Sequence, residues 1–118
     1  KWAIELQEKM NELFYDQENG GFFATDGTDD SIVLRMKEEY DGAEPSENSF
    51  APANLVRLGN MIQKEEYIEM AKATLAFQSS NLSQNPIIAP HAIYALDMIV
   101  NPPKQIILSG DPESYEIK

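Results

Sequence analysis

The stretch from Tyr40 to Ser49 limits the fold most, because it ends one element and starts another. Gly42 admits a positive φ, while Pro45 fixes its own φ and pushes Glu44 into an extended conformation, so no helix or strand continues through this stretch. The residues that follow can cap a new helix, with Pro52 in its first turn, where the missing N–H costs nothing. The candidate caps are Ser46, Asn48 and Ser49. The sequence therefore predicts a loop here and a helix that begins within it.

Apolar residues recur at helical spacing in four segments, which indicates a mainly α fold. The segments are residues 1–15, 51–63, 65–79 and 90–100. A tight link at Lys64 joins the second and third, which predicts two antiparallel helices. The fourth is apolar almost all round, so we expect a helix buried on several sides, and Pro90 suits its first position.

Two extended segments separate the first helix from the second. Phe22-Phe23 opens one of them, and residues 31–39 alternate in polarity, with Arg35 and Lys37 on the same side. Polar residues 25–30 suit the tip between them, so the sequence predicts an inserted β-hairpin. The three aspartates of that tip lack the spacing of a calcium-binding loop, and no metal site is predicted.

The end of the chain predicts the opening of a small α/β tail. Residues 101–103 are Asn-Pro-Pro and end the last helix, after which residues 104–110 have the pattern of a buried strand. Asp111-Pro112-Glu113 then suits the cap and first turn of a helix. We therefore divide the chain into a helical domain, residues 1–102, and the start of a tail, residues 103–118.

Charge and composition exclude several functions. Nine basic and twenty acidic residues give a net charge of −11, which would repel phosphates, so we expect no nucleic-acid or anionic-membrane partner. The absence of cysteine excludes disulfides and thiolate chemistry. No apolar run is long enough to span a bilayer, and we expect a cytoplasmic protein that needs no cofactor.

Four ordered motifs carry a resemblance to a known family. They are Gly20-Gly21-Phe22-Phe23-Ala24-Thr25, Leu34-Arg35-Met36-Lys37, Asp41-Gly42-Ala43-Glu44-Pro45-Ser46-Glu47-Asn48-Ser49 and Asn54-Leu55-Val56-Arg57-Leu58. In this order they resemble the spermatogenesis-associated protein 20 family. The resemblance implies a thioredoxin-like domain joined to an α/α toroid of the six-hairpin glycosidase and N-acylglucosamine 2-epimerase type, followed by an α/β tail. This sequence departs from the family at Glu47, where glycine is expected.

The length of the chain limits how much of that architecture it can hold. A closed toroid of about twelve helices, at about 11 to 12 residues each plus loops, needs several times more than 118 residues. We therefore expect a partial α/α toroid. The stripe of Trp2, Leu6, Met10 and Phe14 and the apolar helix at residues 93–100 cannot both be covered by the two helices between them. Such faces should self-associate or pack against a missing part of the chain.

The resemblance implies a carbohydrate-acting or carbohydrate-binding site, with a sugar or another polyhydroxy compound as ligand. Its candidate catalytic residues are Asp41, Glu44 and His91, and its candidate binding residues are Arg35, Lys37, Ser46 and Asn48. Glycoside hydrolysis needs two carboxylates about 5 to 5.5 Å or about 6.5 to 9.5 Å apart, a role open to Asp41 and Glu44. Epimerisation needs a general base, for which His91 is the candidate. The sequence leaves both reactions open.

A non-catalytic role is the competing hypothesis. The region would then be a helical scaffold that supports the thioredoxin-like domain, and its polar motif would hold the central loop. In that case Arg35 or Lys37 would pair with Asp41 or Glu44, and a residue such as Asn48 would cap the following helix. The lone histidine would then be an ordinary hydrogen-bonding residue.

Overall fold

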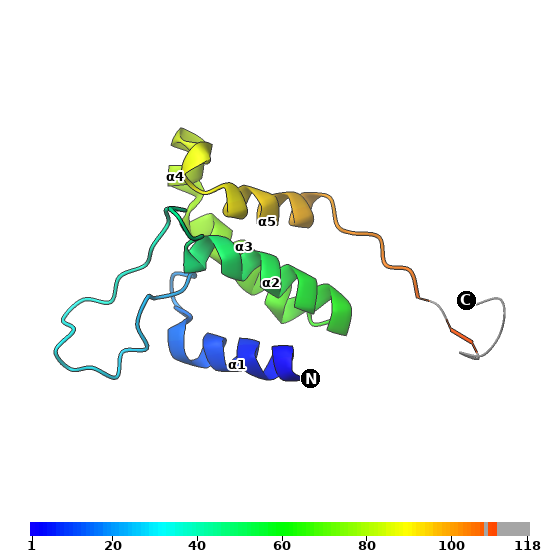
Figure 1. Cartoon of the computed structure of the whole chain (residues 1–118), viewed down its shortest axis with the longest axis horizontal. Helices are drawn as coiled ribbons and strands as arrows, with labels where there is room; N and C mark the ends of the chain where they lie inside the picture. Colours follow the sequence, from blue (N-terminus) through cyan, green and yellow to red (C-terminus); the bar gives the residue numbers. More distant parts are fainter. Residues whose placement is uncertain (108, 111–118) are drawn as a thin grey trace.

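A computed structural model describes residues 1–107 and 109–110 of the chain, and these residues are mainly helical, as predicted. Five α-helices and one 3₁₀-helix follow one another in the described part (Figure 1). They are α1 (Trp2–Phe14), α2 (Glu47–Ile62), α3 (Glu65–Phe77), α4 (Ser79–Gln84), η1 (Pro86–Ile88) and α5 (Pro90–Val100). In the described residues no helix is both long and apolar enough to cross a membrane.

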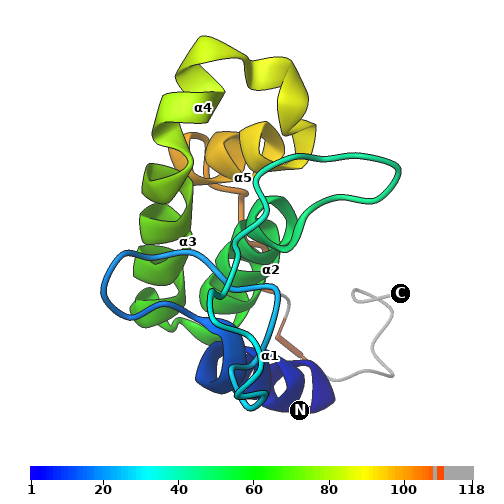
Figure 2. The same cartoon turned by 90° about the vertical axis from the view of Figure 1, so that its left-hand side faces the viewer.

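Helix α2 is the centre of the structure, with α3 and α5 packed against it (Figures 1 and 2). Gln63 ends α2 in the left-handed conformation, at φ 56°, and the chain turns directly into α3. Gly59 permits this close packing, because a Cβ added there would lie 2.8 Å from Ile68 Cδ1. The antiparallel helical hairpin expected at Lys64 is therefore present.

Two apolar clusters hold the helices together. The first joins α2 and α3 to the segment that follows α1, and its buried members are Phe22, Ala51, Leu55, Val56, Tyr67 and Ala71. The second joins α5 to the other side of the hairpin, and its buried members are Ala53, Leu75, Ala89, Ala92 and Ala95. Small alanine side chains let α5 lie close to α2, and burial of apolar surface stabilises both contacts.

Helix α5 is buried on one side only, which corrects the expectation of a helix covered on several sides. Ala92 and Ala95 are fully buried, whereas Ile93, Leu96 and Val100 are exposed. Helix α1 is covered still less. Trp2 is 75% exposed and Leu6 54% exposed, so the apolar stripe of α1 is uncovered along its first half.

The predicted β-hairpin is absent from the described residues, and that prediction was wrong. Between Phe22 and Tyr40 the chain forms a projecting loop (Figure 1), crossed by one backbone hydrogen bond, from Ala24 N to Met36 O at 2.8 Å. An isolated hairpin is stable only when one of its faces packs against something. The alternating segment finds no such surface here, since Val33 is 98% exposed and Leu34 is 72% exposed.

The end of the chain also differs from the prediction. Residues 104–107 form no strand, and Ile106 and Ile107 are 82% and 78% exposed, so the predicted buried strand is not seen there. Leu108 and residues 111–118 lie outside the described residues, and the helix expected at residue 111 lies among them. A closed toroid needs further hairpins, so the toroid and the proposed domain boundary stay predictions.

The turn after α1 gives a test of this packing. Gly20 has φ 73°, and a Cβ added there would lie 2.7 Å from the carbonyl oxygen of Ala73 in α3. Gly20→Ala should therefore lower the free energy of unfolding by about 1 to 3 kcal/mol, measured by urea denaturation. Gly42→Ala is the matched control, because a Cβ there would meet only the Tyr40 ring at 3.5 Å. Equal stability of the two variants would contradict this account of the turn.

Candidate functional site

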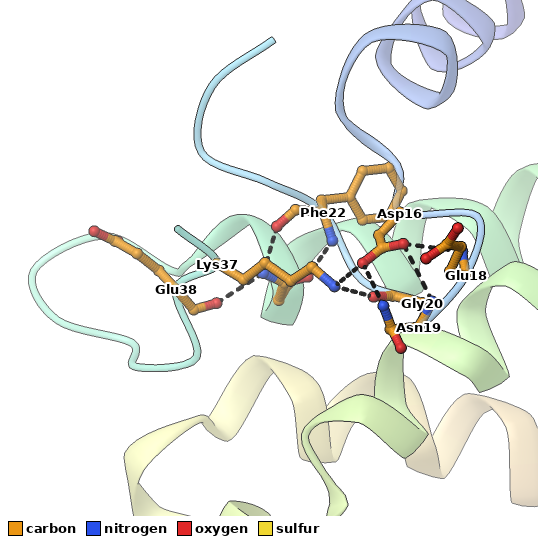
Figure 3. Close-up of polar contacts among 8 residues, drawn as sticks. Asp16, Glu18, Asn19, Gly20, Phe22, Lys37 and Glu38 are labelled. Atoms are coloured by element: carbon orange, nitrogen blue, oxygen red, sulfur yellow. Dashed lines mark hydrogen bonds and ion pairs between the residues drawn. The ribbon is translucent and has the colours of Figure 1, made fainter. Parts of the chain in front are cut away.

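The side chain of Asn48, the second residue of α2, takes the place of a strand partner. Asn48 is fully buried, and its Oδ1 accepts a hydrogen bond from Phe22 N at 2.6 Å. Its Nδ2 donates to Phe22 O and to Glu38 O, both at 2.9 Å. A carboxamide presents the same donor and acceptor as a peptide group, so it satisfies both backbone groups of Phe22. Two segments far apart in sequence are thereby fixed to the start of α2 (Figure 3).

The backbone of Asn48 is satisfied by a second amide. Helix α2 begins at Glu47, so Pro52 is the sixth residue of the helix. The prediction that Pro52 lies in the first turn was therefore wrong. Proline has no N–H to donate to the carbonyl four residues earlier, which is that of Asn48. Gln78 Nε2 donates to this carbonyl at 2.6 Å, and Gln78 is 1% exposed. A residue that follows α3 thus replaces the missing hydrogen bond of α2.

Lys37 is a predicted ligand-binding residue, but its ammonium group contacts other residues of this chain. Its Nζ lies 2.7 Å from Asp16 Oδ2 and donates to Gly20 O at 2.6 Å (Figure 3). The ammonium group also lies 4.8 Å and 4.4 Å from the ring centroids of Phe23 and Phe77. The hydrogen bond from Lys37 holds the pKa of Asp16 well below its usual range, against the effect of burial. The pair therefore closes the turn between α1 and Phe22.

Arg35 is engaged in the same manner. Its guanidinium donates to Leu13 O at 3.0 Å and, through Nε, to Thr25 O at 3.0 Å. It also lies over the Phe23 ring, 4.1 Å from the centroid. Neither cation pairs with Asp41 or Glu44, although the scaffold hypothesis expected such pairs. Both bind the segment at the end of α1 instead.

Asp41 joins the start of α2 to the start of α5. Its carboxylate accepts hydrogen bonds from Ser46 N at 3.0 Å, from Ser46 Oγ at 3.3 Å and from His91 N at 3.0 Å. A negative charge is favourable at two helix N-termini. Burial acts to raise the pKa of Asp41, but hydrogen bonds from the Ser49 hydroxyl and from the backbone of Ser46 and His91 outweigh it and lower the pKa. Ser46 itself is the N-cap of α2, because its Oγ accepts from Ser49 N at 3.2 Å.

Glu44 is placed differently from the other candidates. It is exposed and lines an open groove of about 510 Å³ at the start of α2, together with Glu47, Phe50 and Asn54. The His91 ring lies nearby, with its centroid 5.8 Å from that of Phe50. The structure thus brings Asp41, Ser46 and His91 together, whereas Arg35 and Lys37 contact the end of α1.

Three residues that hold this region together were not among the predicted site residues. They are Asp16, Phe22 and Gln78. One signal was available for Gln78, since a proline inside a helical pattern leaves a carbonyl that another donor must satisfy. Among the described residues, no group of three acidic or histidine side chains is arranged to hold a metal ion. Asp26 and Asp29, in the loop of residues 25–30, accept hydrogen bonds from Thr28 N and Ser31 N.

Comparison with known proteins gives matches that cover all or nearly all of this chain. The chain is 34% identical over 121 aligned residues to spermatogenesis-associated protein 20 of Rattus norvegicus and 31% identical over 119 to that of Homo sapiens, in both cases over 100% of this chain. It is 37% identical over 97% of its length to an uncharacterised protein of Caenorhabditis elegans. The chain spans 15% of the length of each relative. No family model and no solved structure matches. These matches confirm the resemblance drawn from the four motifs.

The Asn48 contacts give a direct mutational test. Asn48→Ala should lower the free energy of unfolding by about 2 to 5 kcal/mol, because a buried N–H and two carbonyls lose their partner at about 1 to 3 kcal/mol each before relaxation. Asn48→Asp, which keeps the shape and the acceptor but loses both donated bonds, should also destabilise the chain at neutral pH. Asn60→Ala, in the last turn of the same helix, is the control and should change stability little. Urea unfolding would contradict the assignment if Asn48→Asp were as stable as the natural chain.

The Lys37–Asp16 pair predicts a dependence of stability on pH. Because the folded pKa of Asp16 is below its usual value of 3.8, its contribution is present above about pH 4 and is lost as the pH falls toward the folded pKa. The melting temperature of the natural chain should therefore fall more between pH 5 and pH 3 than that of Asp16→Asn. Asp30→Asn, at an exposed loop position, should keep the natural profile. Parallel profiles for all three chains would show that Asp16 does not contribute to the loss of stability at low pH.

Proposed function

Since the chain is homologous over its whole length to a segment of spermatogenesis-associated protein 20, we propose that it serves as a non-catalytic helical scaffold within a longer protein of this family. The observation that carries the proposal is the use of the polar motif inside the fold. Asn48 fixes Phe22 and Glu38, and Asp41 joins two helix N-termini. Lys37 and Arg35 bind the turn and the end of α1. The scaffold would support the thioredoxin-like domain that the resemblance implies.

The energetics of these contacts favour a structural role. A sugar hydroxyl that approached Asn48 or Lys37 would have to replace hydrogen bonds that are already made. Asn48 is fully buried, and the side chain of Lys37 is 9% exposed. Leaving one buried donor or acceptor unpaired costs about 1 to 3 kcal/mol, so binding through these groups would have to offset that cost first. Side chains whose hydrogen bonds are already made within the fold fix the helices and loops relative to one another.

A sugar-binding role is the second candidate, and the groove beside Glu44 favours it. Two carboxylates, an amide and a partly exposed aromatic ring line this groove, from Glu44, Glu47, Asn54 and Phe50. Such a lining suits a polyhydroxy ligand, which needs hydrogen-bond acceptors around an apolar surface. His91 lies next to Phe50 and would supply the base for an epimerisation. For hydrolysis, Asp41 would have to give up hydrogen bonds to the two helix starts.

An NMR titration distinguishes the two candidates. Amide shifts of the 118-residue chain would be followed as glucose, mannose, N-acetylglucosamine and N-acetylmannosamine are added to millimolar concentration. The scaffold proposal predicts no saturable shift at Phe22, Glu38, Asp41 or Asn48. Saturable shifts at these residues would contradict it, because their side chains would then be available to a ligand.

The same titration tests the groove with a matched pair of variants. If a sugar causes saturable shifts confined to Glu44, Phe50 and Asn54, Glu44→Gln should weaken binding at least about tenfold, as expected for a hydrogen bond to a charged group. Glu18→Gln removes another exposed carboxylate, from the turn after α1, and should leave the affinity unchanged. Equal affinity for the two variants would exclude Glu44 from the site.

A further inference from the structure

The turn after α1 contains the dipeptide Asn19-Gly20, and Asn19 is the only asparagine of the chain that glycine follows. A peptide nitrogen can attack the side-chain carbonyl carbon of the asparagine before it. Glycine hinders this attack least, because it has no Cβ and its backbone reaches conformations closed to other residues. Asn19 is exposed, so water reaches the carboxamide group. The turn therefore contains the groups needed for a modification that requires no enzyme.

The modification is a deamidation. Gly20 N forms a bond to Asn19 Cγ, the bond between Cγ and Nδ2 breaks, and Nδ2 leaves as ammonia with the proton that Gly20 N has lost. A water molecule then opens the cyclic imide by adding OH to one of its carbonyl carbons and H to its nitrogen. Opening at Cγ gives aspartate, and opening at the backbone carbonyl carbon gives isoaspartate. No group is oxidised or reduced, and either product adds one carboxylate.

The folded turn opposes the first step of this reaction. Gly20 N donates to Asp16 O at 3.0 Å, so the proton that this nitrogen must lose is held in a hydrogen bond. Asn19 Nδ2 donates to Asp16 Oδ2 at 3.2 Å, which holds the carboxamide against the Asp16 carboxylate (Figure 3). Asp16 Oδ1 also accepts from the backbone N–H groups of Glu18 and Asn19. The attack therefore requires these hydrogen bonds to open first.

Lys37 holds Asp16 in this position. Its Nζ lies 2.7 Å from Asp16 Oδ2 and donates to Gly20 O at 2.6 Å (Figure 3). The side chains of Lys37 and Asp16 are only 9% and 12% exposed, and a hydrogen bond between charged groups is stronger than one between neutral groups. Loss of the Lys37 contacts would release both the carboxylate that binds Asn19 and the peptide group of Gly20. Opening of the turn is therefore controlled by the Lys37–Asp16 pair.

We propose that Asn19 is a site of spontaneous deamidation, and that the Lys37–Asp16 pair suppresses the reaction in the folded chain. Neither product fits the folded turn. Isoaspartate lengthens the main chain by a methylene next to Gly20, where an added Cβ would already lie 2.7 Å from Ala73 O. Aspartate replaces the amide donor to Asp16 by a second carboxylate. A chain that has reacted therefore cannot form the same turn again.

Mass spectrometry of tryptic peptides measures deamidation at Asn19 during incubation at neutral pH. The natural chain should react at least about tenfold more slowly when folded than when unfolded in urea. Lys37→Met should react at least about tenfold faster than the natural folded chain, because the turn loses hydrogen bonds from a charged group. Lys9→Met removes an exposed lysine that pairs with Glu12, and it should keep the natural rate. Equal rates in the folded and unfolded natural chain, or the natural rate in a folded Lys37→Met chain, would overturn the proposal.

The urea dependence of the natural chain separates local opening from global unfolding without a variant. Opening of the turn alone exposes little surface, so the rate at Asn19 should change little at urea concentrations at which circular dichroism shows a folded chain. A rate that rises there in proportion to the globally unfolded fraction would show that Asn19 reacts only after the whole chain unfolds. That result would overturn the role of the Lys37–Asp16 pair.

Discussion

The pairing of the Asn48 side chain with the peptide groups of Phe22 is the interaction on which the rest of the structure depends. It occurs in a site with no access to water, because Asn48 and Phe22 are both fully buried. A buried N–H or carbonyl without a partner costs more than a single hydrogen bond contributes, so the amide is required rather than merely favourable. Through it, the segment after α1, the segment before the central loop and the first turn of α2 become one unit.

Helix α2 connects this unit to the other helices. Its N-cap Ser46 and the Asp41 carboxylate fix the start of the helix, and Asp41 also binds the start of α5. Pro52 leaves one carbonyl of α2 without its usual donor, and Gln78 supplies the donor from beyond the end of α3. Three helices are therefore held at one end by side-chain hydrogen bonds and along their length by two apolar clusters.

The sequence predicted α1, α2, α3 and α5, because each depends on local apolar spacing and on residues such as Pro90 that suit a helix start. It did not predict the short helix α4, which has no buried residues and so no apolar spacing to reveal it. It predicted the hairpin wrongly, because alternating polarity indicates which residues lie on the same side of a strand but not whether another part of the chain covers that side. The candidate site was harder still. Asp41 and Asn48 belong to the residue types that bind sugars, and the same types cap helices and replace strand partners. Only the fold distinguishes these uses, because Phe22 and Asn48 are far apart in sequence. Glu44, which lines an open groove, still fits the sugar hypothesis that its sequence context raised.

Hydrogen exchange at the amide of Phe22 tests the central claim most directly. Phe22 lies in no helix, and its N–H donates to the Asn48 side chain. Without that hydrogen bond, the amide of Phe22 would exchange rapidly with solvent. We expect this amide to be protected as strongly as those of Leu55 and Val56 in the core of α2, and we expect Asn48→Ala to remove the protection at Phe22 before it affects the core of the helix. Rapid exchange at Phe22 in the natural chain would contradict the account, because the Asn48 side chain would then not hold the segment in solution.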